Sequence, residues 1–124
     1  AIGSQTSIFQ VCTTDIWSIL SSLDLYVHAS IFEGMPVSVL EAIAAGCPIV
    51  ATDSGGIREL VTGPEHGWLV PQGDFVALVA AIDNALDCQE GARLRATRAR
   101  EHVRANYLEQ HAMNNWRKLI QNAA

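Results

Sequence analysis

Short apolar runs alternate with helical patterns over the first half of the sequence, and this alternation restricts the fold more than any other feature. The runs are too short and too uniformly apolar for strands with one solvated face. They occupy residues 7–11, 24–28, 48–51 and 67–70, and the helical patterns between them occupy 14–23, 36–46 and 56–61. Strand-helix alternation of this kind is typical of a parallel sheet with helices on its faces. We therefore predict an α/β fold.

Turn and capping residues mark the ends of these segments. Thr13 or Thr14 is suited to cap the first helix, because a hydroxyl can accept a hydrogen bond from a free amide of the first turn. Gly46 stands where a residue of left-handed conformation would end the second helix. Pro71-Gln-Gly-Asp has the composition of a turn and is expected to lead the chain out of the last strand.

The remainder of the chain is predicted to be helical. Its first helix carries one apolar stripe, formed by Phe75, Leu78, Val79, Ile82 and Leu86. Two further amphipathic helices are predicted over 90–105 and 108–122. No linker or repeat interrupts the sequence, so residues 1–124 are expected to form a single, partial domain. Its sheet and crevice lie in 7–73 and its C-terminal helices in 74–122.

Length, composition and charge narrow the class of protein. A chain of 124 residues with 49% hydrophobic content can bury one real core. The formal net charge of -5 argues against a surface for nucleic acid, whose phosphates require a basic footprint. We expect no nucleic-acid partner.

The three cysteines, Cys12, Cys47 and Cys88, are widely separated and lack the close spacing of zinc or disulfide frameworks. They are interpreted as reduced, packed thiols, which suits a cytoplasmic location. The four histidines show no i, i+4 pairing, so no metal site is expected. No apolar run approaches the roughly 20 residues that span a bilayer.

The second predicted helix has an unusual beginning. If Pro36 is its first residue, Met35 is the cap, and a methionine cannot accept a hydrogen bond from the first turn. The amides of Val37, Ser38 and Val39 then have no obvious side-chain partner. An uncapped helix N-terminus carries about half a positive charge and is suited to bind an anion. The Ser38 hydroxyl could donate to that anion or serve only the first turn.

Two glutamates flank this helix tip. Glu33 precedes it, with Gly34 allowing close approach to the backbone, and Glu41 lies about 7.5 Å along the axis from Pro36. Two ionised carboxylates repel phosphate, so they are expected to accept hydrogen bonds from hydroxyl groups. A ligand with hydroxyls at both ends and phosphate in the middle fits this layout, and a nucleotide sugar is such a ligand.

A second loop is expected to line the same crevice at the carboxyl ends of the strands. Ser54 is available there as a cap, and Gly55 and Gly56 permit close backbone approach, although they could simply form a turn. His28, at the end of a predicted strand, could face the ligand or be a packed core histidine. The sequence alone leaves both alternatives open.

These residues resemble a known family. The stretch "EGMPVSVLE" is similar to the E-x7-E signature of GT-B glycosyltransferases of family 4, also called group 1. The stretches "AIAAGCPIVATDSGGIRELV" and "GWLVPQGD" continue the family pattern, which extends from about residue 8 to about 107. The resemblance implies a Rossmann-like domain, the C-terminal half of an enzyme that moves a sugar from a nucleoside diphosphate with retention of configuration and without a metal.

The resemblance also implies roles for single residues. Glu33, with Gly34 and Met35, would face the hydroxyls of the donor sugar, and Glu41 would hydrogen-bond the ribose. The backbone of Pro36 to Val39 would face the diphosphate. No general base, general acid or cofactor is assigned.

Parts that the family possesses are not found in this sequence. These parts are the acceptor-binding N-terminal domain and the first strand-helix units of the C-terminal domain, which carry a basic residue pair. This chain by itself is therefore expected to be inactive. A peripheral contact of the complete enzyme with the inner face of a membrane is one interpretation of Arg93, Arg100 and Arg104, and a solvated helix face is the other.

A second hypothesis is a non-catalytic nucleotide-binding or interaction module with the same fold, for which Glu33 would be dispensable. A dinucleotide-dependent dehydrogenase is excluded, because no G-x-G-x-x-G follows any predicted strand. Trp17, Trp68 and Trp116 are isolated aromatics and are expected to serve packing rather than sugar stacking.

Overall fold

The computed structural model describes residues 15–30 and 36–107. The strand predicted over 7–11 and the helix predicted over 108–122 lie outside the described residues, as do Cys12 and Trp116. The loop residues Glu33, Gly34 and Met35 also lie outside them.

Three parallel strands form the described sheet, in the order β1 (Tyr26–His28), β2 (Ile49–Thr52) and β3 (Trp68–Val70). Helices connect successive strands, as parallel pairing requires. Helix α1 (Ile16–Ser22) precedes β1, α2 (Val37–Ala44) joins β1 to β2, and α3 (Ile57–Leu60) lies between β2 and β3. Helices α4 (Phe75–Asp87) and α5 (Gln89–Tyr107) follow β3. The predicted α/β fold is confirmed, with every described element close to its expected position.

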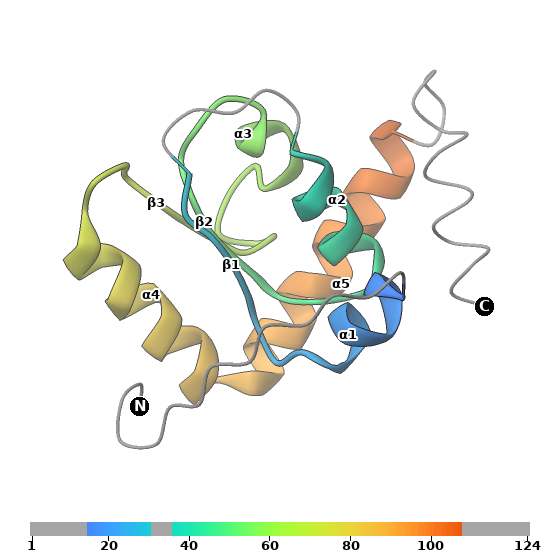
Figure 1. Cartoon of the computed structure of the whole chain (residues 1–124), viewed down its shortest axis with the longest axis horizontal. Coiled ribbons are helices and arrows are strands. Elements are labelled where there is room, and N and C mark those ends of the chain that lie inside the picture. Colours follow the sequence, from blue (N-terminus) through green and yellow to red (C-terminus); the bar gives the residue numbers. More distant parts are fainter. Residues whose placement is uncertain (1–14, 31–35, 108–124) are drawn as a thin grey trace.

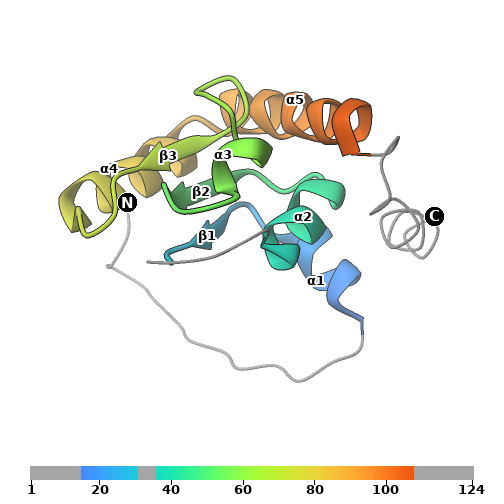
Figure 2. The same cartoon turned by 90° about the horizontal axis from the view of Figure 1, so that it is seen from above.

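Helices cover both faces of this sheet, with α4 on one side and α2 on the other (Figure 1). Strand β2 is fully buried and distributes its side chains by simple alternation. Ile49 and Ala51 join a cluster with α2, α3 and the second half of α5, whereas Val50 packs against Ala81 and Ala85 of α4. Figure 2 shows α4 and α5 following one another along the molecule, and α5 also contacts α2. The long α5 thus contributes to the core on the α2 side.

Two predicted helix starts are wrong by one or two residues. The cap of α1 is Asp15, not Thr13 or Thr14, and its carboxylate accepts a hydrogen bond from the Ser18 amide at 3.2 Å. Pro36 is the N-cap residue of α2 and not its first helical residue, so Met35 is not the cap. Proline fits this position because its backbone is extended there, with φ at -78° and ψ at 105°.

The apolar stripe predicted for α4 is also partly wrong. Phe75 and Val79 are 76% and 50% exposed, whereas the alanines Ala81 and Ala85 are buried against the sheet. Leu78 and Ile82 pack beside those alanines as predicted. Small side chains let the helix approach the sheet closely, so the contact face is centred on alanine and not on the largest residues.

Both predicted turns are confirmed. Gly46, just after α2, has φ at +79°, and Gly73 has φ at +76° in the turn between β3 and α4. Left-handed conformations of this kind carry a steric penalty for residues with a Cβ atom. Asp74 then caps α4, because its carboxylate accepts a hydrogen bond from the Ala77 amide at 2.9 Å.

Candidate functional site at the carboxyl ends of the strands

The carboxyl ends of the three strands meet at one edge of the sheet, as parallel pairing dictates. Helix α3 and the beginning of α2 lie at this end of the molecule (Figure 1). Open α/β sheets bind their ligands at this edge. The candidate site is therefore built from the residues that follow β1, β2 and β3 together with the first turn of α2.

The first turn of α2 offers free amides at this edge. No side chain among the described residues caps the helix, and the first intrahelical bond runs from the Leu40 amide to the Pro36 carbonyl at 3.2 Å. The side chains of Val37 and Ser38 are exposed, whereas Val39 is fully buried and anchors the turn in the core. The predicted uncapped helix tip is thus present, one residue later than expected.

Glu41 lies on the second turn of α2 and is half-buried. Its neighbours Ala42 and Ile43 are fully buried, which fixes this part of the helix against the sheet. Glu33, Gly34 and Met35 lie outside the described residues, so their predicted contacts with a donor sugar stay predictions. The structure gives a position to one of the two carboxylates of the signature.

A pair of hydrogen bonds that sequence reasoning missed joins the ends of β1 and β2. Thr52 Oγ1 accepts a hydrogen bond from the Ser30 amide at 2.8 Å and donates one to the Ser30 carbonyl at 2.6 Å. Thr52 is only 7% exposed. One buried hydroxyl therefore satisfies both backbone groups of Ser30 and holds the point from which the loop toward Glu33 departs.

An ion pair lies at the end of β2. The Arg58 guanidinium of α3 makes two hydrogen bonds to Asp53, one of them from Nε to Oδ1 at 2.6 Å and the other from Nη2 to Oδ2. These bonds from Arg58 hold the pKa of Asp53 below its usual value. The Asp53 amide donates to the Val70 carbonyl, and Gln72 Nε2 donates to the Asp53 carbonyl at 3.0 Å. Asp53 thus connects the loops after β2 and β3.

The predicted crevice residues after β2 behave differently from one another. Ser54 is 2% exposed, its hydroxyl donates to the Thr52 carbonyl at 3.5 Å, and it does not cap α3, whose N-cap residue is Gly56. Gly55 is exposed with φ at +47°, so the glycine pair forms a turn. His28, the last residue of β1, is half-buried and its ring stacks on Tyr26 with centroids 6.4 Å apart. Ser54 is thus buried and His28 packs on its strand neighbour, and their expected contact with a ligand stays a prediction.

A largely apolar cavity of about 260 Å³ opens on the α4 side of the same edge. Ala29, Ser30 and Thr52 form its wall at the strand ends, and Phe75 and Leu78 of α4 close the opposite wall. The cavity is on the other face of the sheet from α2. It is thus separate from the free amides of the helix tip.

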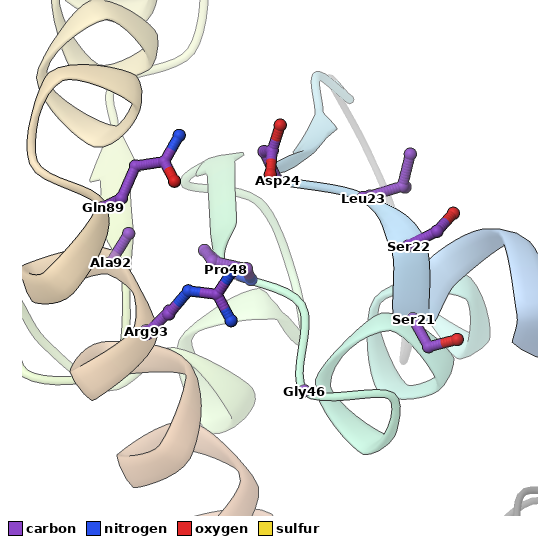
Figure 3. A pocket seen from close by; sticks show the side chains of 9 residues that line it. All are labelled: Ser21, Ser22, Leu23, Asp24, Gly46, Pro48, Gln89, Ala92 and Arg93. Atoms are coloured by element: carbon purple, nitrogen blue, oxygen red, sulfur yellow. The ribbon is translucent and has the colours of Figure 1, made fainter.

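A smaller hollow of about 100 Å³ lies at the opposite, amino ends of the strands (Figure 3). Asp24, Gln89 and Arg93 bring polar groups to it, and Pro48 also lines it. Arg93 therefore lies far from the candidate site. Of the other two arginines in the predicted basic face, Arg100 is half-buried, and its buried Nε has no hydrogen-bond partner among the residues that the structure describes. That face of α5 is therefore not uniformly solvated.

Packing explains the described tryptophans, as the sequence predicted. Trp68 lies in the cluster under α4, and the Arg95 guanidinium sits 3.9 Å from the centroid of its ring. Trp17 packs against the core on the α2 side. No group of three metal-ligating side chains occurs in the part of the chain that the structure describes. Within the same residues, no helix has both the length and the apolar character to cross a membrane.

The architecture matches the C-terminal domains of GT-B proteins. The C-terminal domain of a glycosyl transferase group 1 family protein, LpcC, from Francisella tularensis aligns with 82% of this chain and 52% of its own, at 27% identity and a TM-score of 0.70. The Anabaena protein Alr3699/HepE, solved in complex with UDP, aligns with 89% of this chain and 30% of its own, at 22% identity and a TM-score of 0.74. This fold is the Rossmann-like half of a GT-B structure.

Sequence comparison defines the family. The model of the family "Glycosyl transferases group 1" matches residues 2–102, and the chain belongs to this family. The protein named "Putative colanic acid biosynthesis glycosyltransferase WcaL" of Salmonella typhimurium is 36% identical over 104 residues, which cover 77% of this chain and 25% of WcaL. The chain thus spans about a quarter of the length of the curated relative.

Proposed function

We propose that this chain is the donor-binding part of a glycosyltransferase that moves a sugar from a nucleoside-diphosphate sugar to a saccharide or lipid-linked acceptor. The uncapped first turn of α2 at the carboxyl edge of the sheet carries this proposal. Free amides at a helix N-terminus are suited to a diphosphate, because they supply both hydrogen bonds and partial positive charge. Membership of the group 1 family supports the sugar-transfer chemistry.

The parts of the donor are assigned along the helix. The amides of Val37, Ser38 and Val39 receive the diphosphate, and the Ser38 hydroxyl, which is on an exposed residue, adds one donor. Glu41, one turn further and half-buried, accepts hydrogen bonds from the ribose hydroxyls. Glu33, with Gly34 and Met35, is assigned to the donor sugar on the basis of the sequence signature.

The proposed reaction retains the anomeric configuration and proceeds without a metal. Leaving-group charge is then stabilised by the helix tip and by basic residues elsewhere in the complete enzyme. This chain alone is expected to bind the donor weakly and to transfer no sugar, because no acceptor site is assigned to it.

Amide chemical shifts of the isotopically labelled chain test the proposal directly. The chain is titrated with UDP, GDP and ADP, and the amides of Val37 to Val39 are followed. One of these nucleotides is expected to shift them, and Glu41→Ala is expected to weaken that response about tenfold by removing a charged hydrogen-bond acceptor. Glu101→Ala, at an exposed position of α5, is the matched control and leaves the response unchanged.

The proposal is wrong for this chain if no nucleotide at millimolar concentration moves the α2 amides. Binding that survives Glu41→Ala unchanged would instead place the ribose elsewhere. If Glu33→Ala leaves the affinity for a nucleotide sugar unchanged, the result would favour the alternative hypothesis, a nucleotide-binding module that transfers no sugar.

A further inference from the structure

Positive charge is distributed unevenly over the described residues. They contain six arginines and no lysine, and five of the six lie on α5. The sixth, Arg58, is on α3 beside the carboxyl edge of the sheet. Arg58 is therefore the one basic side chain, among those the structure describes, on the short segment that follows β2 at the candidate donor site.

The alternation of side chains along β2 places Asp53 on the α2 side of the sheet, and Arg58 is paired with it. Side chains two positions apart on a strand point to the same face, and those of Ile49 and Ala51 face α2. Asp53, two positions after Ala51 and just past the end of β2, is therefore on this face as well. The Asp53 amide still donates to the Val70 carbonyl at 2.7 Å, so the backbone remains in the sheet register at this point. Ile57 and Leu60 of α3 pack into the same core as α2. Helices α2 and α3 contact each other, so the ion pair at the start of α3 lies on the same side of the sheet as the first turn of α2.

The geometry of the pair leaves donors available. Arginine carries five N–H donors in a planar fork, and the two hydrogen bonds to Asp53 come from Nε and Nη2. The Arg58 side chain is 71% exposed, whereas that of Asp53 is 26% exposed and is held through its backbone by the loop after β3. Asp53 therefore fixes one side of the guanidinium while the rest faces solvent.

We propose that Arg58 binds the anionic phosphates of the donor beside the first turn of α2, and that Asp53 is a positioning residue that orients its guanidinium. This proposal rests on the proposed donor site. A bound diphosphate brings more than one negative charge next to the carboxylates of Glu41 and Asp53. The N-terminus of a helix supplies only about half a positive charge, which does not balance these negative charges. A guanidinium can bind phosphate oxygens through two parallel hydrogen bonds while it keeps a carboxylate partner on its other edge.

Calorimetric titration of the 124-residue chain with pyrophosphate, UDP and uridine tests the proposal. Pyrophosphate has no base or ribose, and uridine has no phosphate, so the two probes separate the anion contact from the rest. Arg58→Gln is expected to weaken pyrophosphate and UDP binding about tenfold, the loss of a charge-assisted contact, and to leave uridine binding unchanged. Arg58→Lys recovers part of the affinity, and Asp53→Asn, which loosens the guanidinium, weakens binding less than Arg58→Gln.

Arg98→Gln is the matched control, because it removes the same charge from an exposed position on α5. If Arg98→Gln and Arg58→Gln weaken pyrophosphate and UDP binding equally, the loss is explained by the change in net charge alone, and the proposal is overturned. Unchanged pyrophosphate and UDP binding by a folded Arg58→Gln chain would overturn it as well, while the donor site itself would stand. If the unaltered chain binds neither pyrophosphate nor UDP, the donor site fails first, and the assignment of Arg58 fails with it.

Discussion

His66 and His102 stack on one another, with ring centroids 4.6 Å apart, where the loop before β3 meets α5. His66 is 9% exposed, and its Nδ1 lies 2.8 Å from Thr62 Oγ1. His102 Nε2 donates to the Glu59 carbonyl at 2.9 Å, which ties α5 to α3. From the sequence, both histidines were expected to be surface residues without metal spacing, and for His66 this expectation is wrong because the residue is buried. The structure instead shows a bridge between two elements far apart in the chain.

The histidine bridge makes stability depend on pH. Burial, followed by repulsion from His102, lowers the pKa of His66 below its ordinary value of 6.5. The folded chain then binds fewer protons at this site than the unfolded chain, so the free energy of unfolding falls as the pH drops below about 6.5. Urea unfolding at pH 7.5 and pH 5.5 measures this effect. His66→Gln is expected to show a smaller change between the two pH values, and an identical change in both proteins would contradict this role of His66.

Thr52→Val tests the hydroxyl that joins β1 to β2. Valine has the shape of threonine but removes both Thr52 hydrogen bonds to the half-buried backbone of Ser30. The expected cost is about 1–3 kcal/mol of unfolding free energy, with faster hydrogen exchange at the Ser30 amide. Thr97→Val, on exposed α5, is the control and should cost less than about 0.5 kcal/mol. Equal losses for the two variants would argue against a special role for Thr52.

Asp74→Ala tests the cap of α4. Removing its hydrogen bond to the Ala77 amide is expected to cost about 1 kcal/mol, because that donor then lacks its cap. Asp87→Ala removes the same charge from the other end of α4, where a carboxylate is disfavoured by the helix dipole, and should not destabilise the chain. Denaturation midpoints of the two variants check the contrast. A loss for Asp87→Ala as large as that for Asp74→Ala would point to net charge as the cause.

Two glycines are required for different reasons, and alanine substitutions separate them. A Cβ atom on Gly67 would lie 2.8 Å from the Ile49 carbonyl oxygen, so Gly67→Ala must displace backbone and is expected to cost about 1–3 kcal/mol. A Cβ on Gly46 meets nothing within 4 Å, and Gly46→Ala should cost only the penalty of its left-handed conformation, about 1 kcal/mol. Gly46→Asn should recover part of that loss, since asparagine tolerates this conformation. Thermal unfolding ranks the three variants by stability. A larger loss of stability for Gly46→Ala than for Gly67→Ala would contradict the close approach of Gly67 to Ile49.

The local pattern of the sequence was enough to predict the described strands and helices. Strand β2 is apolar throughout because it is buried on both faces, and this leaves a clear signal in four consecutive residues. Gly46 and the turn at Pro71-Gln-Gly-Asp were predicted correctly in a similar way, because turns depend on residue types at fixed offsets. The uncapped start of α2 was also predictable, since only nearby side chains could have capped it.

Tertiary contacts decided the rest of the candidate site. The Thr52 hydroxyl pairs with Ser30 across 22 positions, and no spacing rule connects them. The Arg58 guanidinium could have turned to solvent, and only the turn at Gly55 and Gly56 brings it back to Asp53.

The sequence by itself determined the element order, the parallel α/β class and the place of the free helix tip, because each follows from short-range periodicity or from the chemistry of neighbouring residues. The tertiary structure decided which face of α4 is buried, which hydroxyl closes the end of β1, and that His66 meets His102. These outcomes depend on how closely distant segments approach one another. That approach is set by the packing of the whole core and is not encoded in any single stretch of residues.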